Sequence, residues 1–317
     1  VTSVRPVKAA RALSLGLVDA VVTGDLRAQA VAFARVALGA DLPLPVSARP
    51  VQSPNAAWWD AQRAAIAKRA RGEVAPLRAL DCLRYAAEHP FAEAMAPERA
   101  TFLTLRGSDQ AAALRHVFFA ERAAPRPAHL AQLASRPLRS AGVIGGGTMG
   151  AGIIVALRDA GLPVVLIERD DAAVARGLAT LRGIFDGAVK RGKLTGADLE
   201  ARMAGVTGTT DYARLSDTDL VIEAVFEEMS VKRAVFDQLG KVCRADAVLA
   251  TNTSYLDPRL IAEGLPHAER FIALHFFSPA NVMKLLEIVP TPDTASDVLA
   301  TGFALARMLG KVPVQAG

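Results

Sequence analysis

The sequence is poor in cysteine, in aromatic residues and in long hydrophobic runs, and each shortage excludes a class of protein. Its two cysteines, Cys82 and Cys243, lie far apart without a CxxC pair or a neighbouring histidine pair, so we expect reduced, buried thiols and no metal. Reduced thiols indicate a cytoplasmic compartment. Charged residues or prolines interrupt every apolar stretch before it reaches about 18 residues, so we expect no membrane insertion.

The net charge of +5 and the sequence pI of about 9.5 invite comparison with nucleic-acid-binding proteins. The excess of basic over acidic residues is confined to residues 1–139, which carry 19 Lys and Arg against 11 Asp and Glu. Residues 140–317 carry 18 Lys and Arg against 21 Asp and Glu. The basic residues recur with Ala and Leu at helical spacing, and aromatic residues, which stack on bases, make up only 5% of the chain. We therefore interpret them as solvated helix faces and expect no nucleic-acid partner.

The first part of the chain, residues 1–122, has a mainly helical pattern. One helix is predicted from Leu26 to Leu38, and four more between Ala56 and Glu121. The expected breaks between those four are Gly72, His89-Pro90 and Gly107-Ser108. Proline-rich residues 123–139 predict a linker to the second part.

In residues 140–317, short apolar runs alternate with helical patterns. Strands are predicted at 141–144, 164–167, 219–224, 247–251, 271–276 and 283–289, helices at 148–160, 171–190, 229–242, 258–263 and 294–309, and a run at 311–314 closes the chain. Such alternation predicts an α/β domain with a Rossmann-like, doubly wound parallel sheet. The last two of these strands are separated by a short turn and predict a hairpin-like end to the sheet.

A G-x-G-x-x-G motif, formed by Gly145, Gly147 and Gly150, lies between the first of these strands and the helix that follows. Because this strand-turn-helix setting is the one in which a dinucleotide pyrophosphate meets a helix N-terminus, we predict a dinucleotide site. Glu168 comes 18 residues after Gly150, at the end of the second strand. A carboxylate there accepts hydrogen bonds from the adenosine ribose and repels a 2′-phosphate, which favours NAD over NADP. The alternative is a glycine-rich turn in some other doubly wound protein.

Two polar residues interrupt apolar strands near the end of the chain. His275 lies where the strand at 271–276 gives way to a turn, and Glu287 interrupts the next strand 12 residues later. A histidine in an apolar strand is usually a satisfied core residue, and a lone buried carboxylate is costly. A contact between the two side chains would account for both polar residues in these apolar strands.

Four motifs, GVIGGGTMGAGI, DLVIEAVFEEMSVKRAVF, ATNTSYL and HFFSPANVMKLLEIVP, resemble those of the L-3-hydroxyacyl-CoA dehydrogenases. The similarity is closer still to the bifunctional enoyl-CoA hydratase/L-3-hydroxyacyl-CoA dehydrogenases of fatty-acid β-oxidation. It implies NAD-dependent oxidation of L-3-hydroxyacyl-CoA to 3-ketoacyl-CoA by residues 140–317. Residues 1–122 resemble the C-terminal part of the crotonase fold, the hydratase half of the bifunctional enzymes.

The resemblance also implies roles for individual residues. His275 is implied as the general base, Glu287 as its orienting partner, and Ser254 as a contact of both substrate and cofactor. The remaining implied cofactor contacts, besides the glycines and Glu168, are Thr148, Met149, Val225, Phe226, Glu227, Lys232 and Ser278. Judged without the resemblance, Ser254 is a loop-capping hydroxyl and Lys232 a solvated helix lysine.

The basic cluster Lys190, Arg191 and Lys193 is a candidate contact for CoA phosphates, with an exposed helix end as the equal alternative. The chain begins with Val1 rather than Met, without a secretory signal, so we expect it to be part of a longer protein. The hydratase glutamates and the C-terminal helical domain of the resembling family are expected outside it. Homo-oligomers or a thiolase complex would form through those parts, in the cytoplasm or, in a eukaryote, the peroxisome.

Two other functions remain open. The chain could bind NAD without turnover because it is catalytically incomplete. It could also belong to the β-hydroxyacid dehydrogenases, which share the glycine loop but use a catalytic lysine in a later helical domain. A pairing of His275 with Glu287 argues against the second of these.

Overall fold

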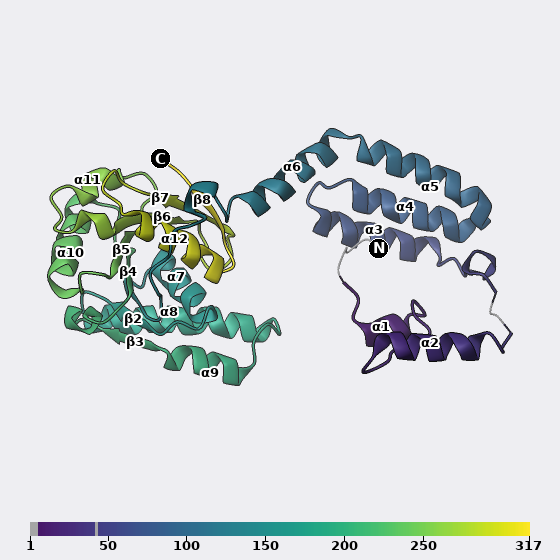
Figure 1. Cartoon of the computed structure of the whole chain (residues 1–317), viewed down its shortest axis with the longest axis horizontal. Helices are drawn as coiled ribbons and strands as arrows, with labels where there is room; N and C mark the ends of the chain where they lie inside the picture. Colours follow the sequence, from purple (N-terminus) through teal and green to yellow (C-terminus); the bar gives the residue numbers. More distant parts are fainter. Residues whose placement is uncertain (1–5, 42–43) are drawn as a thin grey trace. The chain divides into compact units, whose positions relative to one another are not determined.

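The computed structural model describes residues 6–41 and 44–317, and the chain divides into two compact units, residues 1–117 and 118–317. The boundary lies inside a helix that begins in the first unit and ends in the second. The helices of the first unit are α1 (Ala9–Ser14), α2 (Leu26–Ala37), the 3-10 turn η1 (Val46–Ala48), α3 (Ala56–Ala70), α4 (Ala75–Glu88), α5 (Phe91–Arg106) and the start of α6 (Asp109–Ala123) (Figure 1).

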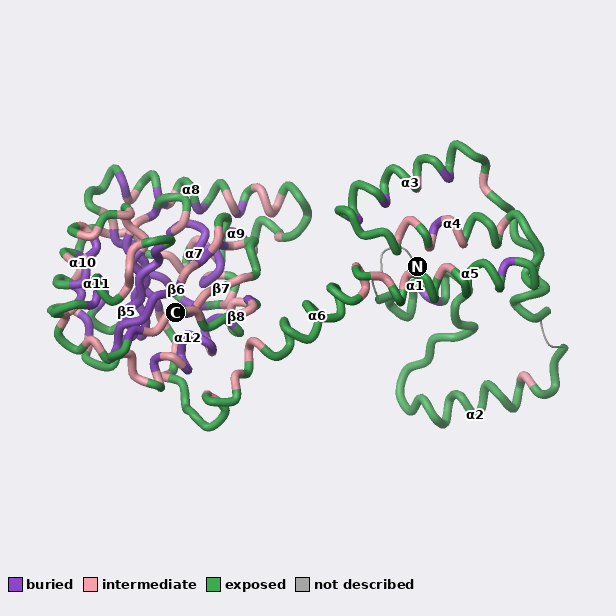
Figure 2. The backbone as a smooth tube through the Cα atoms, turned by 90° about the horizontal axis from the view of Figure 1, so that it is seen from above, coloured by how far each residue is buried: buried purple, intermediate pink, exposed green. Residues whose placement is uncertain are grey.

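The helices predicted in the first unit are confirmed, with ends within two residues of those expected. The first break follows from the backbone, because Arg71 and Gly72, the two residues after α3, have φ +48° and +95°, positive values that end the helix. The core of this unit is small and centres on Trp59, Ile66 and Leu80, from α3 and α4. Helices α2 and α6 bury no residue, as the green tube in Figure 2 shows.

The second unit contains an eight-stranded sheet in the order β3-β2-β1-β4-β5-β6-β7-β8. The strands are β1 (Ala141–Ile144), β2 (Val164–Ile167), β3 (Val206–Thr209), β4 (Leu220–Glu223), β5 (Val248–Thr251), β6 (Phe271–Phe276), β7 (Leu285–Val289) and β8 (Val312–Gln315). All neighbours are parallel except β6 and β7, which form the expected antiparallel pair, but the sheet ends at β8 rather than at this hairpin. From β1, the strands β2 and β3 follow toward one edge of the sheet, and β4 to β8 follow toward the other. The switch point therefore lies between β1 and β4, the position at which doubly wound sheets bind ligands.

Helices cover both faces of this sheet (Figure 1). Helices α7 (Thr148–Asp159), α8 (Asp171–Lys190), α9 (Gly196–Ala204) and α12 (Ser296–Met308) contribute to one core. Helices α10 (Met229–Val242) and α11 (Pro258–Ala262) contribute to the other, with the 3-10 turn η3 (Tyr212–Leu215). Alternate strand residues enter the two cores: Leu220 and Ile222 face the first, and Val221 faces the second. The predicted Rossmann-like fold is therefore confirmed.

Helix α9 and strand β3 were missed by the sequence prediction. Strand β3 is a four-residue edge strand without a fully buried residue, so it lacks the apolar run by which the other strands were found. The start of α9 had a detectable signal, since Thr195 and Asp198 form a capping box. Strand β3 extends the sheet beyond β2, and α9 packs against α8 and β3.

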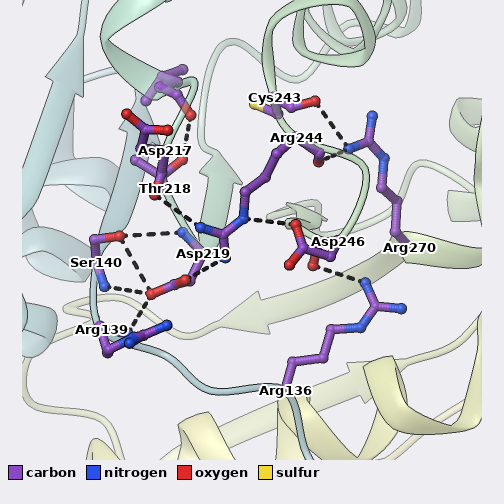
Figure 3. A network of polar contacts seen from close by, with 11 residues as sticks. Arg136, Arg139, Ser140, Asp217, Thr218, Asp219, Cys243, Arg244, Asp246 and Arg270 are labelled. Carbon is purple, nitrogen blue, oxygen red and sulfur yellow. Dashed lines mark hydrogen bonds and ion pairs between the residues drawn. The ribbon is translucent and has the colours of Figure 1, made fainter.

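The chain enters β1 through a polar network at the amino edge of the sheet (Figure 3). Asp219, the residue before β4, accepts hydrogen bonds from the backbone N–H groups of Arg139 and Ser140 and pairs with Arg244. Arg136 donates to the carbonyl of Asp246 at 3.0 Å. These contacts tie the segment before β1 to the residues that precede β4 and β5, and so fix where β1 and its glycine loop begin.

Candidate active site

The glycine loop joins β1 to α7 and is held by backbone contacts that exclude larger side chains. Gly145 has φ +95°, and a Cβ atom there would lie 2.9 Å from the carbonyl oxygen of Ala224. A Cβ atom on Gly150 would lie 1.8 Å from the carbonyl oxygen of Gly145. Both glycines are therefore required for the close packing of α7 on the sheet. Gly147 differs, because a Cβ atom there meets nothing within 4 Å.

The amino end of α7 is open. Gly147 is its N-cap residue and no side chain caps the helix, so the first N–H groups, including those of Thr148 and Met149, have no helical partner. Free N–H groups and the positive end of the helix dipole together form an anion site. Glu168, at the end of β2, accepts a hydrogen bond from the N–H of Gly146 at 2.7 Å. Its place beside the loop is the one expected, and its ribose contact stays a prediction.

His275 and Glu287 face each other across the antiparallel pair β6 and β7, where the register places them directly opposite. The Nδ1 atom of His275 lies 2.8 Å from Oε2 of Glu287. Their side chains are 18% and 34% exposed, so the pair opens to solvent rather than being enclosed in the core. The predicted contact between the two side chains is present; the catalytic roles stay predictions.

Lys232 of α10 is fully buried, and the interpretation of it as a solvated helix lysine is wrong. Its Nζ atom donates to both oxygens of Glu223 at 2.9 and 3.0 Å and to the carbonyl oxygen of Asn252 at 3.0 Å. Glu223 is the last residue of β4 and is also fully buried. Burial raises the pKa of Glu223, and the adjacent Lys232 ammonium opposes that shift.

Glu227 connects this buried pair to the surface. Its Oε2 atom lies 3.3 Å from Lys232 Nζ, and its Oε1 atom accepts hydrogen bonds from the N–H of Ser254 at 2.8 Å and from the Thr253 hydroxyl. Burial favours a raised pKa for Glu227, but the hydrogen bonds from Thr253 and Ser254 and the charge of Lys232 outweigh it, so the pKa lies below its usual value. Ser254 is exposed and its hydroxyl caps no backbone group, so the loop-capping interpretation has no support.

The carboxyl ends of β1, β4, β5 and β6 are adjacent in the sheet, so the glycine loop, Glu223 and His275 share one edge. The other expected residues at this edge are Val225 and Phe226, which follow β4, and Ser278, which follows β6 and is exposed. Lys190, Arg191 and Lys193 are also exposed, but they lie at the far end of α8. A helix of 20 residues is about 30 Å long, so the structure does not bring them to this edge.

Sequence reasoning missed Glu223, Thr251 and Asn252. The Thr251 hydroxyl donates to Glu223 Oε2 at 2.6 Å, and Asn252 Oδ1 accepts from the N–H of Phe276, the residue after His275, at 3.0 Å. All three are polar residues at or just after the carboxyl ends of apolar strands, a signal that was available and was applied only to Glu168 and His275. Asn252 thereby links the Lys232 network to the strand that carries His275.

Residues 140–317, more than half of the chain, match the family described as 3-hydroxyacyl-CoA dehydrogenase, NAD binding domain. The chain belongs to this family. The peroxisomal bifunctional enzyme of Cavia porcellus is 36% identical over 330 residues, covering 100% of this chain and 45% of that protein. This chain thus spans less than half the length of that relative.

Two solved structures of dehydrogenases each match more than half of the chain. A 3-hydroxybutyryl-CoA dehydrogenase from Escherichia coli has a TM-score of 0.55 and 38% identity, and the match covers 57% of this chain and 38% of its own. The dehydrogenase part of multifunctional enzyme 1 from Caenorhabditis elegans has a TM-score of 0.54 and 31% identity, covering 59% of this chain and 43% of its own.

The cofactor of this dehydrogenase domain is NAD, and the residues at the carboxyl edge of the sheet fit it. Space beside Gly147 and the uncapped start of α7 suit a pyrophosphate, and the carboxylate of Glu168 keeps lone pairs for ribose hydroxyls. Among residues 6–41 and 44–317, no group of three or more His, Cys, Asp or Glu side chains is placed to hold a metal. Within the same ranges, no helix combines the length and the apolar character needed to cross a membrane.

Proposed function

We propose that this chain takes part in the NAD-dependent oxidation of L-3-hydroxyacyl-CoA to 3-ketoacyl-CoA in fatty-acid β-oxidation. The observation that carries the proposal is the 2.8 Å contact between His275 Nδ1 and Glu287 Oε2, at the sheet edge that also bears the glycine loop. A histidine held by a carboxylate supports proton removal from a substrate hydroxyl. The relatives named above as 3-hydroxybutyryl-CoA and bifunctional enzymes support an acyl-CoA substrate.

His275 is the general base in this proposal. Its Nδ1–H donates to Glu287, which fixes the tautomer and leaves Nε2 free to accept the proton of the 3-hydroxyl group. Glu287 then stabilises the imidazolium that forms. Bound NAD supplies the hydride acceptor for the hydrogen on C3. Ser254, exposed and anchored through its N–H to Glu227, would donate its hydroxyl to the developing carbonyl oxygen.

The cofactor would be held by the glycine loop, Thr148, Met149 and Glu168 on its adenosine and pyrophosphate side. On the nicotinamide side the proposal assigns Glu227, supported by Lys232, with Val225, Phe226 and Ser278 around them. The basic cluster at the end of α8 is left out, since its distance from the sheet edge favours an exposed helix end.

For the rest of the chain we propose the organisation that the resemblance implies. Residues 1–122 would be the C-terminal part of a crotonase-like hydratase domain and residues 123–139 the linker, which the match of a bifunctional relative along the whole chain supports. Several relatives are named as peroxisomal, which supports a peroxisomal location in a eukaryote and a cytoplasmic one otherwise. Homo-oligomers or a thiolase partner belong to the same proposal.

The test is acetoacetyl-CoA-dependent oxidation of NADH, followed by the loss of NADH absorbance. We expect His275→Gln to lower kcat by about a hundredfold to ten-thousandfold, the usual contribution of general acid–base catalysis, with NADH binding retained. Glu287→Gln should have a smaller effect of the same kind, since it removes only the orienting charge.

The matched control is His267→Gln. His267 also has a carboxylate partner, Glu269, at 3.2 Å, but this pair lies on the exposed turn before β6. Turnover that persists in His275→Gln would refute the proposal. NAD binding without any turnover by the unaltered chain would support the alternative of a catalytically incomplete piece.

A further inference from the structure

Glu223 carries a negative charge in this network, because its hydrogen bonds leave no site for a proton. Oε1 accepts from the N–H of Val225 at 2.8 Å and from Lys232, and Oε2 accepts from the Thr251 hydroxyl and again from Lys232. Each oxygen therefore receives two hydrogen bonds, which uses the full accepting capacity of a carboxylate. The ammonium group of Lys232 is thus matched by one fully buried anion.

Glu227 is the second carboxylate beside Lys232, and it has no cation of its own. Its remaining partners, the Ser254 N–H and the Thr253 hydroxyl, are neutral. In the described part of the chain, Lys232 is the sole cation that forms an ion pair with it. Glu223, Lys232 and Glu227 together carry one net negative charge. Since Glu223 is fully buried and the Glu227 side chain is 22% exposed, that charge is presented at the surface by Glu227.

We infer that Glu223 is a positioning residue that neutralises Lys232, leaves Glu227 as an uncompensated carboxylate, and thereby shifts the relative affinity of the site toward oxidised NAD+ and away from NADH. The inference rests on the proposed function, which assigns Glu227 to the nicotinamide half of the cofactor. The nicotinamide ring carries a positive charge when oxidised and none when reduced, so one nearby carboxylate attracts only the oxidised form. Without Glu223, the charge of Lys232 would cancel that of Glu227, and this shift in relative affinity would disappear.

The experiment measures the dissociation constants of NAD+ and NADH separately, by titration calorimetry and by NADH fluorescence, for the 317-residue chain. In Glu223→Gln we expect the ratio Kd(NADH)/Kd(NAD+) to fall by about threefold to tenfold, as expected for one charge acting near the protein surface. Glu227→Gln should lower the ratio by a similar factor. The double variant Glu223→Gln/Lys232→Met removes both charges of the buried pair and should restore the original ratio.

A structural role alone would weaken the binding of both nucleotides equally, and an unchanged ratio in Glu223→Gln would overturn the inference. Glu228→Gln is the matched control, because the exposed carboxylate of Glu228 accepts a hydrogen bond from the Ser230 hydroxyl and forms no ion pair with the Lys232 ammonium. Thermal melting checks that each variant folds. If Glu223→Gln does not fold, the partly exposed Glu227→Gln decides, and an unchanged ratio there also overturns the inference. Failure of the unaltered chain to bind either nucleotide would instead refute the proposed function.

Discussion

The glycine loop allows the folding and binding roles of single residues to be separated. Gly147 has φ −66° and ψ −169°, which alanine also adopts, and an added Cβ atom meets nothing within 4 Å. Gly150 has the opposite environment, since its Cβ atom would overlap the backbone oxygen of Gly145 at 1.8 Å. We therefore expect Gly147→Ala to keep the fold and lose NAD affinity, and Gly150→Ala to lose both.

The magnitudes follow from these surroundings. At position 147, alanine is a poorer N-cap than glycine, but it also restricts the unfolded chain by about 0.4–1 kcal/mol, so the free energy of unfolding should change by less than about 1 kcal/mol. A methyl group at the uncapped start of α7 keeps the pyrophosphate from the backbone N–H groups. Hydrogen bonds to a charged group contribute about 1.5–3 kcal/mol each, so the loss of one raises the Kd of NAD by about tenfold to a hundredfold.

Gly183→Ala is the matched control, because Gly183 lies within α8 and an added Cβ atom there also meets nothing within 4 Å. It should stabilise the protein by about 0.5–1 kcal/mol and leave NAD binding unchanged. Thermal denaturation and titration calorimetry give the two quantities. Unaltered NAD affinity in Gly147→Ala would refute the placement of the pyrophosphate at this loop, and a stable Gly150→Ala would refute the packing argument.

Three further predictions concern groups away from the loop. Burial favours a raised pKa for Asp219, but hydrogen bonds from backbone N–H groups and an arginine bring it below its usual value. The melting temperature of Asp219→Asn should therefore lie below that of the wild type at neutral pH, and the difference should shrink as the pH falls below about 4. Cys243 is buried with a pKa raised to about 11, so iodoacetamide should label Cys82 in the native protein and Cys243 only after unfolding, as peptide mass spectrometry would reveal. Lys311→Met leaves two carbonyls of the β6–β7 loop without their donor and should lower the free energy of unfolding in urea by about 2–4 kcal/mol; an unchanged midpoint would contradict this.

The sheet could be predicted from the sequence wherever a strand is buried on both faces. Strands β1 and β2 have the bounds expected of them because their apolar runs are continuous and end at Gly145 and Glu168. Edge strand β3 has Thr and Gly in place of that run, since one of its sides has no neighbouring strand. Its pairing with β2 depends on residues some 40 positions away, which no local pattern records.

The difference between a local pattern and a contact distant in the sequence also explains why the pair His275–Glu287 was found and the pair Glu223–Lys232 was not. His275 and Glu287 each interrupt an apolar strand, and the short connection between those strands allows only an antiparallel pairing, so the local pattern determined both partners. Lys232 lies on a helix with polar neighbours, Arg233 among them, and nothing nearby distinguishes it from a solvated lysine. Its burial depends on Glu223, which ends an apolar strand and is costly to bury alone. A carboxylate in such a place requires a cation, and a search for that cation from the strand, rather than from the helix, would have led to Lys232.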